Sequence, residues 1–189
     1  EGLNDPNIFK AFFLAGGPGS GKSFVVGKTT GGTGLKIVNS DDVFEKYLKD
    51  AGFEMDMTTS KAELQQEPRD KLRDRAKVVT KMKQDNYVDG RLGLVIDGTG
   101  ADYDKIVRQS IGLKQLGYDT HMIYVNTSLD VALDRNSKRE RKVSTSIATK
   151  SWKDVQSNLG KFSQHFRRNM IVVDNNEVLE DDGTLFNDV

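Results

Sequence analysis

The feature that most constrains this chain is the run Gly16-Gly17-Pro18-Gly19-Ser20-Gly21-Lys22-Ser23. It satisfies the pattern G-x-x-x-x-G-K-[ST] in full, and it lies between an apolar run and a helix-like segment. Glycines are required there because successive backbone N–H groups must turn inward toward phosphate oxygens, where a Cβ would obstruct. The run therefore predicts a nucleoside-triphosphate site at the end of a buried strand.

The residue types in this loop predict separate roles. Lys22 brings a positive charge to the outer phosphates, and the Ser23 hydroxyl ligates Mg²⁺. The helix that starts near Gly21 adds the positive end of its dipole. The predicted cofactors are therefore ATP, or GTP, together with Mg²⁺. The residues predicted to bind the nucleotide are Gly17, Pro18, Gly19, Ser20, Gly21, Lys22 and Ser23.

Short apolar segments alternate with helix-like segments along the chain, a pattern that favours a parallel sheet covered by helices on both faces. We therefore predict an α/β fold, a P-loop NTPase-type parallel sheet of about five strands flanked by helices. The predicted strands lie near residues 12–15, 35–39, 93–97, 121–125 and 170–174.

Several residues are typical of helix ends. Ser60 with Glu63, and Ser151 with Asp154, are arranged as capping boxes. Asp102 is suited to cap a helix that Gly117 closes.

The length of 189 residues fits a single domain over 1–189. The segment 60–90 is long and charged, with a break before Pro68, and it predicts a helical excursion over the sheet edge. Residues 135–150 form a predicted basic lid. Residues 175–189 carry several carboxylates and no basic side chain, so we expect an acidic, solvated tail.

Charge and composition exclude several classes of protein. Lys plus Arg and Asp plus Glu both number 28, so the net charge gives no support to a general nucleic-acid binder. Disulfide scaffolds and thiolate metal sites are excluded because the chain has no cysteine. No apolar run approaches the roughly 20 residues that span a bilayer, and no signal-peptide pattern is present. We therefore expect a soluble, cytoplasmic protein without a membrane partner.

An acidic residue ends the third predicted strand, where Ile96-Asp97-Gly98-Thr99-Gly100 follows two apolar residues. A carboxylate at the carboxyl end of a parallel strand faces the crevice where ligands bind in open α/β sheets. Asp97 is therefore predicted to hold Mg²⁺ through water, as a Walker B carboxylate does, and the alternative is a turn with Gly98. The match to D-x-x-G also invites a GTPase interpretation, but segment 126–130 lacks the lysine of Asn-Lys-x-Asp. A GTPase switch is a minor alternative.

Two neighbouring carboxylates follow the second predicted strand, in Asn39-Ser40-Asp41-Asp42. Asp42 is suited to cap the next helix, with Glu45 three residues later completing a box. Asp41 comes directly after the strand and is better aimed at the crevice beside the glycine-rich loop.

Cations are concentrated after the fourth predicted strand. They are suited to close over the phosphates, stabilise charge in the transferring group and exclude water. The alternative is a solvated helix face. The candidates for contact with the phosphates are Arg135, Arg139 and Arg141.

The chain resembles zeta-toxin-like P-loop kinases, including small phage-encoded proteins of this type, over most of residues 12–141. Besides the glycine-rich run, the resemblance rests on Asn39-Ser40-Asp41-Asp42, Ile96-Asp97-Gly98-Thr99, Leu113-Lys114-Gln115-Leu116-Gly117-Tyr118 and Val131-Ala132-Leu133-Asp134-Arg135-Asn136. It leaves open a phage origin with action in a bacterial host, and an antitoxin-like protein partner.

The resemblance implies roles for individual residues. It makes Lys22 and Ser23 the phosphate and metal residues, and Asp41 the base that takes a proton from an acceptor hydroxyl. It also makes the three arginines candidates for a cationic lid. Asp97 stands where such proteins often carry Glu. Thr99 is followed by Gly100 and not by the arginine that zeta toxins commonly place near there, so the amino-sugar nucleotide of the zeta toxins is not implied.

The leading hypothesis is an ATP- and Mg²⁺-dependent kinase that transfers the γ-phosphoryl group to a hydroxyl or phosphate of a small molecule. A sugar nucleotide, a nucleoside or a nucleotide is the expected acceptor. The alternatives are a nucleotide-dependent switch or interaction module and a polynucleotide end kinase, with nucleic acid not favoured. The candidate acceptor contacts are Asp42, Thr99, Arg69 and Arg73.

Overall fold

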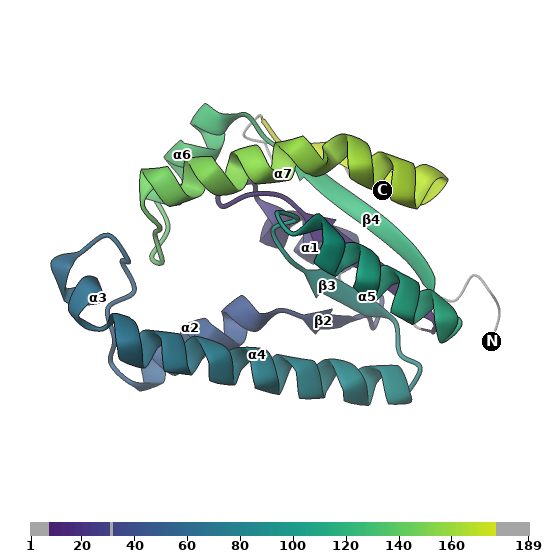
Figure 1. The fold of residues 1–189 in the computed structure, drawn as a ribbon, viewed down its shortest axis with the longest axis horizontal. Helices are drawn as coiled ribbons and strands as arrows, with labels where there is room; N and C mark the ends of the chain where they lie inside the picture. Colours follow the sequence, from purple (N-terminus) through teal and green to yellow (C-terminus); the bar gives the residue numbers. More distant parts are fainter. Residues whose placement is uncertain (1–7, 31, 177–189) are drawn as a thin grey trace.

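The fold is built on five parallel strands (Figure 1). The structure is a computed structural model, and it describes residues 8–30 and 32–176. The strand order across the sheet is β2-β3-β1-β4-β5, and every neighbouring pair is parallel. The predicted α/β class and the five-stranded P-loop NTPase-type sheet are confirmed. The strands are β1 (Lys10–Ala15), β2 (Lys36–Val38), β3 (Leu94–Asp97), β4 (Asp119–Asn126) and β5 (Met170–Asp174).

Helices connect the strands, because parallel neighbours need crossover connections. They are α1 (Lys22–Thr30), α2 (Ser40–Asp50), α3 (Ser60–Leu64), α4 (Gln66–Asp89), α5 (Tyr103–Gln115), α6 (Leu129–Ser137) and α7 (Thr145–Phe166), with a short 3₁₀ helix over Arg167–Asn169.

The two faces of the sheet have separate cores. Alternate residues of β1 point to opposite faces, so Phe13 packs with α5 and α7 whereas Leu14 packs with α1. Phe162 of α7 is fully buried in the first core, and Val25 of α1 is buried in the second. Figure 1 shows α5 and α7 crossing the same face of the sheet. The central strands are thus covered on both faces, which explains their almost continuous apolar sequences.

The segment 60–90 forms α3 and α4, and α4 runs along the β2 edge of the sheet (Figure 1). Pro68 lies in the first turn of α4, where a missing N–H removes no helical hydrogen bond. A third core joins α4 to α2 through Phe44, Leu48 and Ala76. The excursion therefore builds a wall beside the sheet that is held mainly by α2.

One predicted pair of helix ends is confirmed. The Asp102 side chain accepts a hydrogen bond from the Lys105 N–H at the start of α5. Gly117 follows the end of that helix with a φ of 93°. Both features follow from local chemistry, since a short acidic side chain satisfies free N–H groups and glycine adopts a left-handed conformation at no steric cost.

Two helix caps lie at other residues than predicted. The cap of α3 is Thr59, whose hydroxyl accepts from the Ala62 N–H, and not Ser60. The helix expected to begin after Ser151 begins at Thr145, because the Ser144 hydroxyl caps it and accepts from the Ile147 N–H. Ser151 therefore lies inside a longer helix.

The predicted acidic tail falls mostly outside the described residues, since 177–189 are not among them. Asn175, which was assigned to that tail, is buried and belongs to the nucleotide loop's surroundings. The solvated tail therefore does not begin at residue 175.

Candidate active site

The glycine-rich loop is enclosed by elements that are distant in sequence. Gly19 has a φ of 79°, and a Cβ there would lie 2.0 Å from the carbonyl oxygen of Ala132 in α6. Gly21 has a φ of 86°, and a Cβ there would lie 2.2 Å from the Asn175 side chain. Glycine at both positions therefore avoids a close contact and adopts a left-handed backbone that other residues rarely adopt.

Side chains from two later segments hold the loop in this shape. The Ser20 carbonyl accepts hydrogen bonds from the Thr127 hydroxyl at 3.2 Å and from the Asn175 side-chain amide at 2.7 Å. Sequence reasoning missed Thr127 and Asn175. The available signal was their position, since each follows a strand whose carboxyl end meets the loop at one edge of the sheet.

Lys22 lies at the start of α1 with its amine turned back to the loop. Its Nζ donates to the Gly16 carbonyl oxygen at 2.5 Å. Burial lowers the pKa of the Lys22 amine, and the Asp97 carboxylate opposes this shift, while Arg139 adds to it. Over the described residues the Lys22 amine has one hydrogen-bond partner, a carbonyl oxygen, so this desolvated cation gains most from a ligand that brings negative charge.

Asn39 connects the second and third strands at their carboxyl ends. Its side-chain oxygen accepts from the Asp41 N–H at 2.9 Å, which caps α2. Its amide donates to Asp42 at 2.9 Å and to Asp97 at 3.1 Å. The predicted cap at Asp42 is therefore wrong, because Asp42 lies in the first turn and Asn39 is the cap. An asparagine directly after a strand and before Ser-Asp-Asp was the signal for this role.

Three carboxylates and a buried amine share this end of the sheet. Burial raises the pKa of Asp97, Lys22 lowers it, and the carboxylates of Asp42 and Asp41 raise it further. The charge of Arg139 also acts on both Asp97 and Lys22. The structure thus brings together the predicted metal residue, the predicted base and one predicted lid cation.

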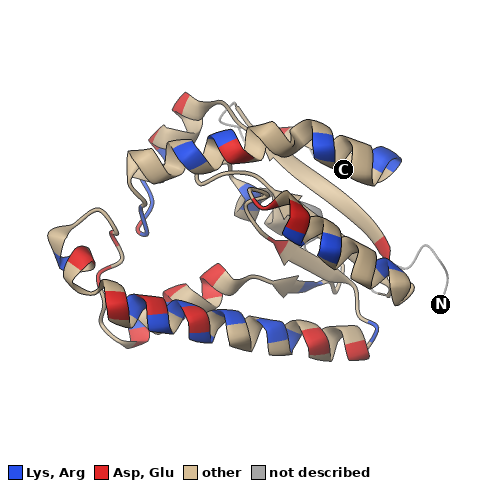
Figure 2. Cartoon of the chain, viewed as in Figure 1, with Lys and Arg blue, Asp and Glu red and all other residues tan. Residues whose placement is uncertain are grey.

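The predicted lid, residues 135–150, covers the end of α6, the loop between α6 and α7, and the first turns of α7. Figure 2 shows basic residues in that loop. Arg141 leaves this loop and contacts Asp41 at 3.2 Å and Glu45 at 3.1 Å. Its guanidinium lies over the Phe44 ring at 5.3 Å, and Arg73 lies over the same ring at 4.6 Å. In this structure Arg141 therefore contacts α2. Closure of the loop over phosphates stays a prediction.

Further contacts join the same loop to the neighbouring segments. Lys49 pairs with Glu140 at 3.0 Å, and Lys142 pairs with Asp56 at 3.2 Å. Arg135 takes a different direction, since its guanidinium donates to the Asn175 carbonyl beside the glycine-rich loop. The three predicted arginines thus face three different surroundings.

The residues present suit a magnesium ion. Mg²⁺ is usually held by one or two carboxylates together with substrate phosphates and water. Within the part of the chain that the structure describes, no group of three or more His, Asp or Glu side chains could hold a metal ion by itself. Asp97 and the exposed Ser23 hydroxyl supply the few protein oxygens that such a site needs. The metal role of these two residues stays a prediction.

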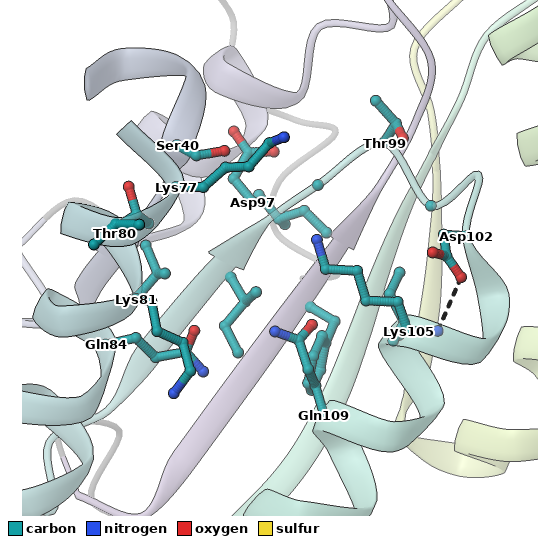
Figure 3. Close-up of a pocket in the computed structure, with 18 of the residues that line it drawn as sticks. Ser40, Lys77, Thr80, Lys81, Gln84, Asp97, Thr99, Asp102, Lys105 and Gln109 are labelled. Carbon is teal, nitrogen blue, oxygen red and sulfur yellow. Dashed lines mark hydrogen bonds between the residues drawn. The ribbon is translucent and has the colours of Figure 1, made fainter. Parts of the chain in front are cut away.

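A cavity of about 530 Å³ lies beside Asp97, between α4 and α5 and over β1 and β3. Figure 3 shows Ser40, Asp97 and Thr99 at one end of it, with side chains of both helices along its sides. This volume falls in the range of roughly 300–1,000 Å³ that is usual for small-molecule sites. The sequence contained no signal for this cavity.

Of the predicted acceptor contacts Thr99, Arg69 and Arg73, only Thr99 lies at the cavity. Thr99 lines the cavity, and its carbonyl accepts from the Gly16 N–H at 2.8 Å. Gly100 follows with a φ of 83°, and a Cβ there would lie 2.6 Å from the side chain of Ala15. Arg69 is 3% exposed and donates to the Glu54 carbonyl. Neither Arg69 nor Arg73 lines the cavity.

The fold and the arrangement of the site agree with a comparison to protein families. The family model described as Zeta toxin matches residues 6–183. The chain belongs to the zeta toxin family. It is therefore a P-loop phosphotransferase, which confirms the resemblance and the predicted class of enzyme. No curated protein matches the chain.

Solved structures show the same fold. A protein from Chloroflexus aurantiacus, provisionally described as a kinase, has 13% identity and a TM-score of 0.58, with 97% of this chain and 94% of that chain covered. AvrRxo1-ORF1:-ORF2 with ATP has 18% identity and a TM-score of 0.61, with 90% and 56% covered. The PezAT toxin-antitoxin system of Streptococcus pneumoniae has 18% identity and a TM-score of 0.52, with 68% and 51% covered. The chain spans about half the length of the last two.

None of the helices over the described residues is long and apolar enough to cross a membrane. A phage origin and a cytoplasmic location stay predictions from the sequence.

Proposed function

We propose that this chain is an ATP- and Mg²⁺-dependent kinase that phosphorylates a hydroxyl of a small molecule. The single observation that carries the proposal is the grouping of Lys22, Asp97 and Asp41 at the carboxyl end of the sheet, where both carboxylates act on the Lys22 amine and Asp97 also lines the cavity. Such a site needs little covalent chemistry from the protein, because positioning and electrostatic stabilisation supply most of the catalysis of phosphoryl transfer.

The glycine-rich loop and Lys22 bind the phosphates in this proposal. The backbone N–H groups of Gly17, Gly19 and Gly21, together with those at the start of α1, cradle the phosphate oxygens. Arg135 lies beside the loop and is placed to contact the nucleotide. Ser23 and Asp97 would hold a metal ion, which would neutralise charge on the phosphate oxygens. Asn39 fixes the direction of the Asp97 carboxylate.

Asp41 acts as the base. It takes the proton from the acceptor hydroxyl while that oxygen forms a bond to the γ-phosphorus, and the bond from the γ-phosphorus to the bridging oxygen of ADP breaks. Arg139 lies close enough for its charge to act on Lys22 and Asp97, which suits a cation that stabilises the transferring group. Arg141 holds Asp41 in place from the loop.

The acceptor occupies the cavity beside Asp97. The reacting hydroxyl meets the end of the cavity that is lined by Ser40, Asp97 and Thr99. Asp42 directly follows the proposed base, Asp41, in the sequence. The test is incubation with γ-labelled ATP or GTP, Mg²⁺ and a panel of acceptors. Labelled product that disappears in Asp41→Asn, while ATP still binds, supports the proposal. ATP binding without any labelled product contradicts it.

An antitoxin-like partner forms part of the same proposal. PezAT is a toxin-antitoxin system, and AvrRxo1-ORF1 was solved together with ORF2. Growth arrest of bacteria that express this chain, relieved by Asp41→Asn, would support a toxic kinase that needs such a partner. Unimpaired growth with an active kinase would contradict it.

A further inference from the structure

We propose that the acceptor of this site is a hydroxyl carried by an uncharged, flat ring system, such as a nucleoside or an aromatic alcohol. This inference rests on the proposed kinase function and assigns the class of its acceptor. It is carried by the lining of the cavity between α4 and α5, whose chemistry differs from that of a site for open-chain sugars or for sugar nucleotides.

The floor of the cavity is apolar. An acceptor with many hydroxyl groups would lose water there without gaining hydrogen bonds, which weakens its binding. A flat ring, in contrast, gains contact over its whole face without that loss. The apolar residues of the floor and of the adjoining face of α5 are Phe13, Val38, Ile96 and Ile106.

The wall formed by α4 continues this apolar surface. Val78 is 59% exposed and Met82 is 61% exposed, and both line the cavity. Both side chains are large and apolar, and they remain exposed beside the apolar floor. A ring placed between α4 and α5 would cover them. Met82 has a flexible thioether, which adapts to the shape of an aromatic ligand.

The charges of the rim do not favour an anionic body. Lys77 pairs with Asp74 at 2.9 Å, and Lys81 pairs with Asp85, all within α4. Each of these two lysines thus has an acidic partner on its own helix, and the rim presents both signs of charge to a ligand. Lys105 also lines the cavity, but the carboxylates of Asp97 and Asp102 line it too.

The polar groups along the sides suit an uncharged ring. The side chains of Gln84 and Gln109 come from opposite helices (Figure 3), and over the described residues neither has a hydrogen-bond partner. An amide both donates and accepts, so this pair can recognise carbonyl or ring-nitrogen atoms at the edge of a ring. The same ring would direct its hydroxyl toward Asp97 and Ser40.

The experiment compares the wild-type chain with the Met82→Glu variant, and Leu116→Glu is the matched control. Leu116 is 58% exposed at the end of α5 and does not line the cavity. Binding of the uncharged apolar dye Nile red is measured first, without ATP. Transfer from labelled ATP to four acceptors follows: uridine, an aromatic alcohol, gluconate and a UDP-linked sugar.

We expect the wild type and Leu116→Glu to bind the dye, and Met82→Glu to bind it about tenfold more weakly with ATP affinity unchanged. We also expect uridine or the aromatic alcohol to be phosphorylated, with a KM raised about tenfold in Met82→Glu. The one of these two acceptors with the higher kcat/KM shows whether the ring belongs to a nucleoside or to an aromatic alcohol. Preferred phosphorylation of gluconate or of the UDP-linked sugar overturns the acceptor class.

Two outcomes separate this inference from the proposed function. Absence of dye binding in the wild type, together with phosphorylation of another acceptor, overturns the ring site and leaves the kinase intact. Dye binding without transfer to any acceptor overturns the kinase function, and the acceptor class with it. Displacement of the dye by a peptide of residues 177–189 also overturns the inference, because the chain itself would then fill the groove.

Discussion

Arg141 of the loop between α6 and α7 contacts Asp41 of α2 at 3.2 Å, although the two residues are separated by 100 positions in the sequence. The Arg141 side chain is only 10% exposed, since it also contacts Glu45 and the Phe44 ring. The contact joins the proposed base to the loop that borders the phosphate site. Arg141 is therefore positioned to set the direction of the Asp41 carboxylate.

Replacement of Arg141 by Met is expected to lower kcat by about 10–100-fold, because Asp41 loses the cation that orients it. Loss of the ion pairs and of the contact with Phe44 should reduce the free energy of unfolding by about 1–2 kcal/mol. Steady-state kinetics and urea unfolding measure the two effects. Lys138→Met is the matched control, because among the described residues the one ion pair of Lys138, the C-cap of α6, is with Asp134. A similar loss of kcat in the control would contradict the role of Arg141.

Gly19→Ala and Gly27→Ala form a second matched pair. The added methyl at Gly19 meets the Ala132 carbonyl at 2.0 Å in a left-handed backbone, whereas nothing lies within 4 Å of one at Gly27. Gly19→Ala is therefore expected to abolish ATP binding. Gly27→Ala should retain it and should stabilise the chain by about 0.5–1 kcal/mol, because Gly27 lies inside α1. Calorimetric titration with ATP and thermal unfolding decide between these expectations.

The Asn39 side chain combines a structural and a functional role. Asn39→Ala removes the cap of α2, at a cost of about 1 kcal/mol in the free energy of unfolding, and it releases Asp97 and Asp42. We expect an additional loss of Mg²⁺-dependent activity, measured by titrating Mg²⁺ in the transfer assay. Ser144→Ala removes the cap of α7 and serves as control. Equal effects of the two changes on the Mg²⁺ requirement would show that Asn39 is only a cap.

Asp97→Asn is expected to abolish transfer and to stabilise the chain without nucleotide. Burial raises the pKa of Asp97 in the folded chain above its unfolded value, so the folded state binds a proton more readily. The stability contributed by Asp97 is therefore present at low pH and falls as pH rises through the raised pKa. Removal of the charge should raise Tm at pH 7 by roughly 2–4 °C and should remove this part of the pH dependence.

Thermal unfolding from pH 4 to pH 8, with and without ATP and Mg²⁺, measures this effect. A lower Tm for Asp97→Asn at pH 7 without nucleotide would contradict the assignment of Asp97 as a partly buried carboxylate held for a ligand. Asp104→Asn is a suitable control, because Asp104 is an exposed residue in the first turn of α5.

The sequence was sufficient to predict the sheet and the glycine-rich loop. Both depend on local patterns, namely apolar strands and glycines before Lys22, and each strand was found near its observed position. Helix caps were less certain, because neighbouring polar residues compete for the same free N–H groups. Asn39 and Ser144 therefore took the roles assigned to Asp42 and Ser151.

The contacts of the loop and the cavity could not be predicted. The Arg141–Asp41 pair depends on how α2 and the loop meet across the sheet, which no local pattern determines. The cavity arises because α4 packs on α2 at the edge while α5 packs on β4, so that a space stays between them. Such a space is set by the distance between elements and has no signal in any one of them.

The most direct test of the central claim is transfer of labelled phosphate from ATP to a hydroxyl acceptor by the wild type and by Asp41→Asn, with ATP affinity measured in parallel. We predict labelled product from the wild type, a loss of at least about 100-fold in Asp41→Asn, and equal ATP affinity in both. Equal transfer by the two proteins would show that Asp41 is not the base. Absence of product from the wild type with every acceptor, despite ATP binding, would contradict the proposed kinase activity.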